Sequence, residues 1–97
     1  MVELKQLTIG GVNALGIILN LPRGVIHFII RNHMILCDDC IDLEKLLKRY
    51  PLLCIIQCPS RDSLDEIVEE KVSKCSDEAS KLGACLGMKV IDVFTLL

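Results

Sequence analysis

The alternation of hydrophobic and polar residues predicts four strands in the first part of the chain. Gly10-Gly11 tolerates the positive φ angles of a two-residue hairpin turn, and turns at Pro22-Arg23-Gly24 and Asn32-His33 follow. The segment over residues 25–31 is nearly all apolar and rich in β-branched residues. The predicted strands cover residues 2–9, 12–21, 25–31 and 34–37. We therefore expect an antiparallel four-strand meander.

The second of these strands has two faces of different composition. One face is purely aliphatic and consists of Leu15, Ile17, Leu19 and Leu21. The other face mixes small, polar and apolar residues, namely Val12, Ala14, Gly16, Ile18 and Asn20. We expect the purely aliphatic face to pack in the core.

Helix periodicity replaces the strand pattern after the fourth strand. Apolar residues recur at helix spacing at Leu43, Leu46, Leu47 and Tyr50. Asp39 or Asp42 can cap this helix, and Pro51 ends it. Residues 52–58 then form a continuous apolar strand, so the order strand, helix, strand implies a right-handed parallel crossover.

Capping signals mark two further helices. Ser63-Leu64-Asp65-Glu66 is a capping box, while Ser76-Asp77-Glu78 begins a helix that Gly83 ends. A short strand is expected over residues 72–75, and residues 88–97 fit either a strand or a helix. The pattern as a whole predicts an α+β fold: a mainly antiparallel sheet with one parallel crossover and helices packed on it.

Composition indicates a self-associating protein. The 97 residues suffice for one domain, 52% of them are hydrophobic, and the mean hydropathy is +0.49. This is more apolar material than a monomer of this size easily buries. We expect a homo-oligomer that associates through the edge of the meander or the outer face of the sheet.

Charge and aromatic content exclude several partners and locations. The net charge is −2, basic residues are scattered, and aromatics make up 3% of the chain, so nucleic-acid binding is not expected. Neither a secretory leader nor a membrane-spanning apolar run is evident. We expect a cytoplasmic protein whose six cysteines stay reduced.

The sequence Cys37-Asp38-Asp39-Cys40 is the main candidate for chemistry. Its spacing suits a thiol redox pair or half of a metal site, although the two carboxylates raise the pKa of a neighbouring thiol. No second Cys pair or CxxH sequence completes a zinc site, so no metal or other cofactor is predicted. Buried core cysteines are the simpler interpretation.

A parallel crossover predicts where a pocket would form. Cys37 and Cys58 end the two parallel strands, and Cys40 begins the intervening helix at the same sheet edge, where such folds bind small molecules. The candidate pocket residues are Cys37, Asp38, Cys40, Gln57, Cys58 and Arg61. His27 is expected on the more solvated face or in a local hydrogen bond, and His33 in a turn.

Several short sequences resemble the YunC-like family of small bacterial and archaeal proteins, a domain of unknown function. They are Leu21-Pro22-Arg23, Met34-Ile35-Leu36-Cys37, Ser63-Leu64-Asp65-Glu66-Ile67, the run from Ser76 to Gly83, and Gly87-Met88. The resemblance implies an α+β fold without an established reaction, a family cysteine at Cys37, and a helix over residues 88–97. Asp38 and Val90 stand where the family pattern usually has glycine.

Three function classes follow from these observations. The first is a non-catalytic binding or assembly module that acts as a homo-oligomer, with a small molecule as a possible ligand. The second is a cysteine-based metal-binding domain, and the third is a thiol-dependent enzyme or redox protein centred on Cys37. No Gly-rich phosphate loop or Ser-His-Asp set is present, so enzymatic activity stays undecided and is the less favoured reading.

Overall fold

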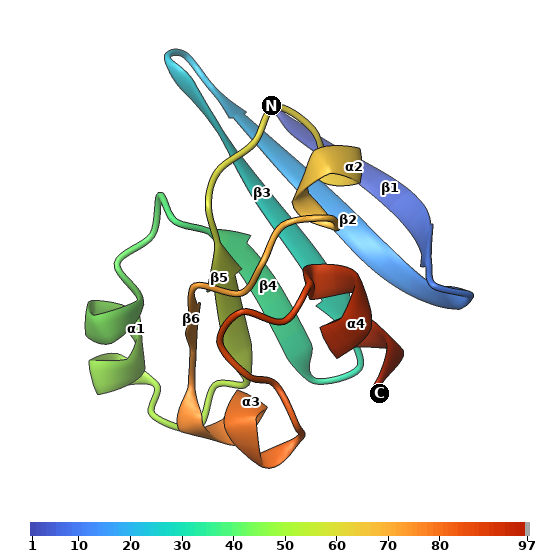
Figure 1. Cartoon of the computed structure of the whole chain (residues 1–97). Coiled ribbons are helices and arrows are strands. Elements are labelled where there is room, and N and C mark those ends of the chain that lie inside the picture. The colour runs from blue at the N-terminus through green and yellow to red at the C-terminus, as the bar shows by residue number, and fades with distance from the viewer. Residues whose placement is uncertain (97) are drawn as a thin grey trace.

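A six-stranded mixed sheet organises the protein, whose computed structural model describes residues 1–96. The spatial order of the strands follows their order in the sequence (Figure 1). Their bounds are β1 Val2–Ile9, β2 Val12–Leu21, β3 Gly24–Arg31, β4 Met34–Asp38, β5 Ile55–Cys58 and β6 Lys74–Cys75. Strands β1 to β4 form an antiparallel meander, and β4 pairs with β5 in parallel. The predicted α+β fold is confirmed.

Four short helices surround the sheet. They are α1 Leu43–Arg49, α2 Leu64–Ile67, α3 Asp77–Lys81 and α4 Val90–Thr95. The side chains of Asp42, Ser63 and Ser76 cap α1, α2 and α3 by accepting from backbone N–H groups three residues further on. None of the helices over residues 1–96 is long and apolar enough to span a membrane.

The structure corrects the predicted ends of two strands and resolves two alternatives. Strand β5 begins at Ile55, not at residue 52, and β6 is reduced to Lys74–Cys75, antiparallel to β5. Asp42 caps α1 and Asp39 does not. The last segment is a helix in α4, while Leu97 lies outside the described residues.

The core lies on the face of β2 that carries the small residues, so the expectation for this strand was wrong. Ala14 and Gly16 are buried, whereas Leu15 and Leu21 are exposed. Helices α2 and α4 cover the Ala14 side in Figure 1, and a Cβ added at Gly16 would lie 2.7 Å from Leu64 Cδ1. Close approach of a helix therefore requires glycine here, and it selects which face is buried.

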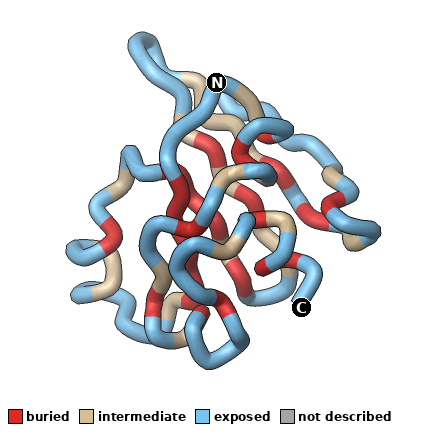
Figure 2. Tube along the Cα trace, viewed as in Figure 1, coloured by how far each residue is buried: buried red, intermediate tan, exposed pale blue. Residues whose placement is uncertain are grey.

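Two apolar clusters occupy opposite faces of the sheet. The larger one joins α2, α3 and α4 to the sheet around Phe94, Ile29 and Leu36. The smaller one packs Leu43 of α1 on Ile55 and neighbouring residues. Figure 2 shows buried residues concentrated along the middle of the sheet, while most of β1 is exposed. Helix α1 thus covers only part of the sheet face that carries the smaller cluster.

Phe94→Ala should destabilise the fold far more than Leu96→Ala, its matched control at the end of the same helix. Phe94 is fully buried and Leu96 is 54% exposed. Removing a buried phenylalanine side chain costs about 3–5 kcal/mol, against about 0.5 kcal/mol or less for an exposed residue. Urea denaturation of both variants measures the difference, and equal midpoints would show that α4 is not docked.

Candidate functional site

The buried carboxylate of Asp38 is the centre of a polar network at the corner between β4 and α1. Asp38 Oδ2 accepts from the backbone N–H of His27 at 3.0 Å and lies 3.3 Å from its ring Nδ1. Both side chains are almost completely buried, with 0% exposure for Asp38 and 2% for His27. Since a carboxylate only accepts, this geometry makes Nδ1–H the donor.

Further hydrogen bonds hold the loop that follows Asp38. Asp38 Oδ1 accepts from the backbone N–H of Cys40 at 3.4 Å. Gln57 on β5 donates from Nε2 to the carbonyl oxygen of Asp38 at 3.2 Å and to that of Ile41 at 2.6 Å. The Gln57 amide thereby ties the end of β4 to the loop that leads into α1.

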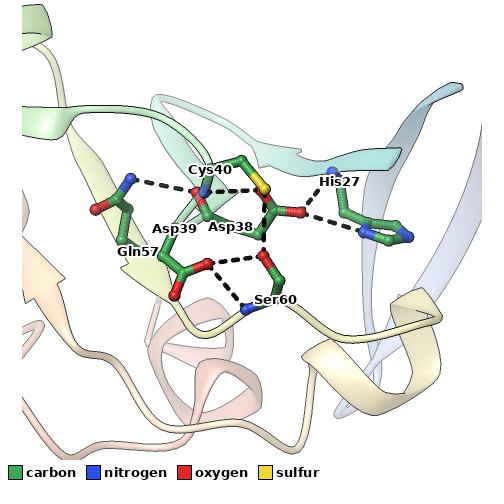
Figure 3. A network of polar contacts seen from close by, with 6 residues as sticks. All are labelled: His27, Asp38, Asp39, Cys40, Gln57 and Ser60. Carbon is green, nitrogen blue, oxygen red and sulfur yellow. Dashed lines mark hydrogen bonds and ion pairs between the residues drawn. The ribbon is translucent and has the colours of Figure 1, made fainter. Parts of the chain in front are cut away.

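An outer part of the network lies closer to solvent. Asp39 Oδ1 accepts from Ser60 Oγ at 2.7 Å and from the backbone N–H of Ser60 at 3.2 Å. Cys40 Sγ lies 3.4 Å from the same hydroxyl group. Figure 3 shows these groups meeting between the β4–α1 loop and the loop after β5. The adjacent carboxylates of Asp38 and Asp39 therefore both have structural roles. Asp38 binds the backbone of His27 and Cys40, and Asp39 binds Ser60.

The structure does not bring the six candidate pocket residues together. Cys37 is paired with Gln57 and Asp38 with Cys58, so Cys37 and Cys58 point to opposite faces of the sheet. Cys37 belongs to the smaller cluster and Cys58 to the larger one. The expectation that these two thiols line one pocket was wrong, because the strand ends are offset by one residue.

Arg61 lies apart from the corner network. Its guanidinium forms ion pairs with Glu66 at 3.4 Å and Glu70 at 3.0 Å. These side chains are partly exposed, and pairs of this kind contribute little to stability. Arg61 thus ties the loop before α2 to that helix.

Burial makes two of the thiols poor nucleophiles. Desolvation raises the pKa of Cys37 to about 11, and the charge of Asp38 adds to this effect while a hydrogen bond from Gln57 opposes it. Desolvation likewise raises the pKa of Cys58 to about 12, with a smaller contribution from Glu70. Neither thiol is ionised at neutral pH, which weakens the case for an enzyme centred on Cys37.

Two adjoining grooves run along α1 and β6. One has a volume of about 610 Å³ and is lined by Asp39, Cys40, Ile41, Asp42, Glu44, Gln57, Ser73 and Lys74. The other, about 620 Å³, is more apolar and is lined by Leu43, Glu44, Leu47, Ser73, Lys74, Cys75, Ser80, Ala84, Cys85 and Leu86. Of the predicted pocket residues, Cys40 and Gln57 line the first groove.

His27 was expected on the more solvated face or in a local hydrogen bond, and the structure gives it a buried contact with Asp38. It is buried on the helix-covered face and hydrogen-bonded to Asp38, eleven residues away in the sequence. The signal was available, because counting outward from the Asn32-His33 turn places His27 directly opposite Asp38. Ser60 had no comparable signal, since it depends on how two loops meet.

The side chains are not arranged as a metal site. Over residues 1–96, no group of three or more His, Cys, Asp or Glu side chains is placed to hold a metal ion. All six cysteines are free thiols, distributed over both faces and the surface. This arrangement gives no support to the metal-binding alternative.

Comparison with known proteins supports the fold and assigns no activity. The chain is similar to the crystal structure of TA1206, a protein of unknown function from Thermoplasma acidophilum. The TM-score is 0.83 at 21% sequence identity, over 98% of this chain and 91% of that one. No protein-family model and no curated protein matches the sequence. At this identity the likeness shows a shared α+β fold.

Alkylation of the folded protein should follow the exposure and pKa of each thiol. Cys40 and Cys85 are exposed, whereas Cys37 and Cys58 are buried and have raised pKa values. With iodoacetamide at pH 8, mass spectrometry should find the first pair modified well before the second. All six should react in urea. Modification of Cys37 as fast as Cys40 in the folded state would show that Cys37 is an accessible thiolate.

Proposed function

We propose that the protein is a self-associating assembly module in which two copies pack through the open face of the sheet. We define the open sheet face as Val2, Leu4, Leu15, Ile17, Leu19, Leu21, Ile26, Phe28 and Ile30. Its exposed fractions reach 65% at Leu4 and 58% at Val2. This continuous apolar surface is the observation that carries the proposal.

The strand register makes the open sheet face continuous. Direct partners across antiparallel strands point to the same side, so Leu4, Ile17 and Phe28 form one row across β1, β2 and β3. The row on one side of it consists of Val2, Leu19 and Ile26, and the row on the other side of Gln6, Leu15 and Ile30. Every other residue on this side of the three strands is uncharged, including Gln6, Thr8 and Asn13. The surface therefore offers nothing to a partner selected by charge.

The size of the face suits a moderate interface. Three strands about 4.8 Å apart and eight residues long cover roughly 400 Å² of flat area. The largest apolar patch of a typical monomer covers about 300–600 Å², and patches of this size are often functional. Two copies together supply roughly 800 Å² of flat area. Because side chains make the surface uneven, its accessible area is larger and approaches the roughly 1,200 Å² of small specific interfaces. We therefore expect association at micromolar concentrations.

A second copy is the occupant that fits this face best. An apolar, uncharged surface is complementary to itself, and a two-fold axis closes the pair so that no further face stays uncovered. Sheets commonly pack in this way about 10 Å apart. Pairing through the β1 edge is less favourable, because charged side chains such as Lys5 on an edge strand discourage edge-to-edge pairing.

Analytical ultracentrifugation of wild type, Leu4→Glu and Leu86→Glu tests the proposal. Leu4 and Leu86 are both 65% exposed, but Leu86 lies by the groove along α1, outside the open sheet face. Wild type and Leu86→Glu should sediment as dimers at tens of micromolar. Leu4→Glu should shift to the 10.8 kDa monomer, because the dimer would bury its carboxylate.

A monomeric wild type at these concentrations would refute the assembly role. Persistence of the dimer in Leu4→Glu would refute the open sheet face as the interface. Dissociation of both variants would likewise contradict it, since the matched control lies elsewhere.

We also propose that the chain is a divergent YunC-like protein. The short sequences that resemble the family fall on the turn after β2, on β4, on α2 and on α3, and the last segment is a helix as the resemblance implies. An experimental structure of a YunC-like protein with a different strand order would contradict this assignment.

We also propose that the protein is cytoplasmic. Six free thiols in one short chain suit a reducing compartment. Rapid alkylation in intact cells followed by mass spectrometry should find them reduced, and stable disulfides would contradict this location.

A further inference from the structure

We propose that the free edge of β6 binds an extended segment of a partner protein, which adds to the sheet as a seventh strand. β6 is the last strand in the sheet, and over residues 1–96 it pairs with β5 alone. It lies beside α1 in Figure 1. The open sheet face is formed by β1 to β3, at the other end of the sheet. The proposal is therefore independent of self-association.

The backbone of β6 presents a donor and an acceptor at this edge. The backbone N–H of Ser76 donates to the carbonyl oxygen of Ile55 at 2.9 Å, so Ser76 faces β5. Because the backbone groups of successive residues in an antiparallel strand alternate in direction, the N–H and C=O of Cys75 face away from β5. An extended polypeptide pairs with both groups at once. The edge therefore calls for a strand as its partner.

Elements on both faces of the sheet turn this edge into a groove. Leu43 and Leu47 of α1 belong to the cluster on one face, and Ala84 belongs to the cluster on the other. These residues, Leu86 and β6 line the apolar groove of about 620 Å³. An added strand directs alternate side chains to the two faces, so both sets would contact apolar residues. A second copy would present the same concave edge, which cannot enter the groove, whereas a single extended segment can.

The charges along the edge indicate the composition of the segment. The more polar groove of about 610 Å³ shares Glu44 and Lys74 with the apolar one, so the two are continuous. Asp39 and Asp42 also line it, which gives three carboxylates against one ammonium. The segment should therefore carry apolar residues beside Cys75 and a basic residue near these carboxylates. Since antiparallel pairing is the more stable, the basic residue should follow the apolar ones in its sequence.

Titration with the peptide Ac-Leu-Val-Leu-Thr-Lys-NH₂, followed by NMR of the backbone amides, tests the proposal. The Cys75 amide should shift in a saturable way and its hydrogen exchange should slow by about tenfold, while the Ser76 amide, already bonded to Ile55, should change little. The matched control is the same peptide methylated on two successive backbone nitrogens, one of which faces β6 in either register. It should bind about tenfold more weakly. A peptide with glutamate in place of lysine should bind about threefold more weakly.

Two exposed leucines locate the binding site on the protein. Leu86 is 65% exposed and lines the apolar groove, whereas Leu82 is 50% exposed and lies outside it. Leu86→Ser should weaken peptide binding by about threefold, and Leu82→Ser should leave it unchanged. Both side chains are at the surface, so the fold should tolerate the changes.

The proposal is overturned if the Cys75 amide shows no saturable shift, if the methylated peptide binds equally well, or if Leu86→Ser binds like wild type. Equal binding of the glutamate peptide would overturn the basic residue of the segment. Protection of the Cys75 amide that is present without peptide and lost on dilution would show that a second copy occupies the edge, which would also overturn the proposal.

Discussion

The buried carboxylate of Asp38 is the constraint on which the central part of the fold depends. A carboxylate without access to water is stable only if hydrogen bonds replace its hydration. Asp38 obtains them from the backbone N–H of His27, from the imidazole ring, and from the N–H of Cys40. These groups come from the neighbouring strand and from the loop that leads to α1. The position of Asp38 therefore fixes the end of the meander and the start of the crossover together.

Asp38 also connects the corner between β4 and α1 to the neighbouring strands β3 and β5. Gln57 on β5 holds the carbonyl group of Asp38, so the parallel pair is closed by side chains where its backbone ladder ends. On the other side, Asp38 accepts from the backbone N–H of His27 and lies beside its ring Nδ1. A glycine at this position would leave the backbone N–H and the ring of His27 without this partner.

Local pattern was sufficient to predict the elements, and long-range packing was needed to place the residues within them. The Gly10-Gly11 turn, the caps at Ser63 and Ser76, and the parallel crossover depend on nearby residues, and each was predicted. The pocket depended on whether Cys37 and Cys58 share a face, which a one-residue offset between parallel strands reverses. Periodicity within one strand contains no information about that offset.

The choice of core face illustrates the same limit. Hydrophobicity alone favours the side of β2 that carries Leu15 and Leu21, yet the structure buries the side with Ala14 and Gly16. Helices of four to seven residues are unstable in isolation and gain stability only through close packing. Small side chains allow Leu64 of α2 to approach the strand. The larger aliphatic residues are left on the other side, where a flat apolar sheet is better suited to another sheet than to a short helix.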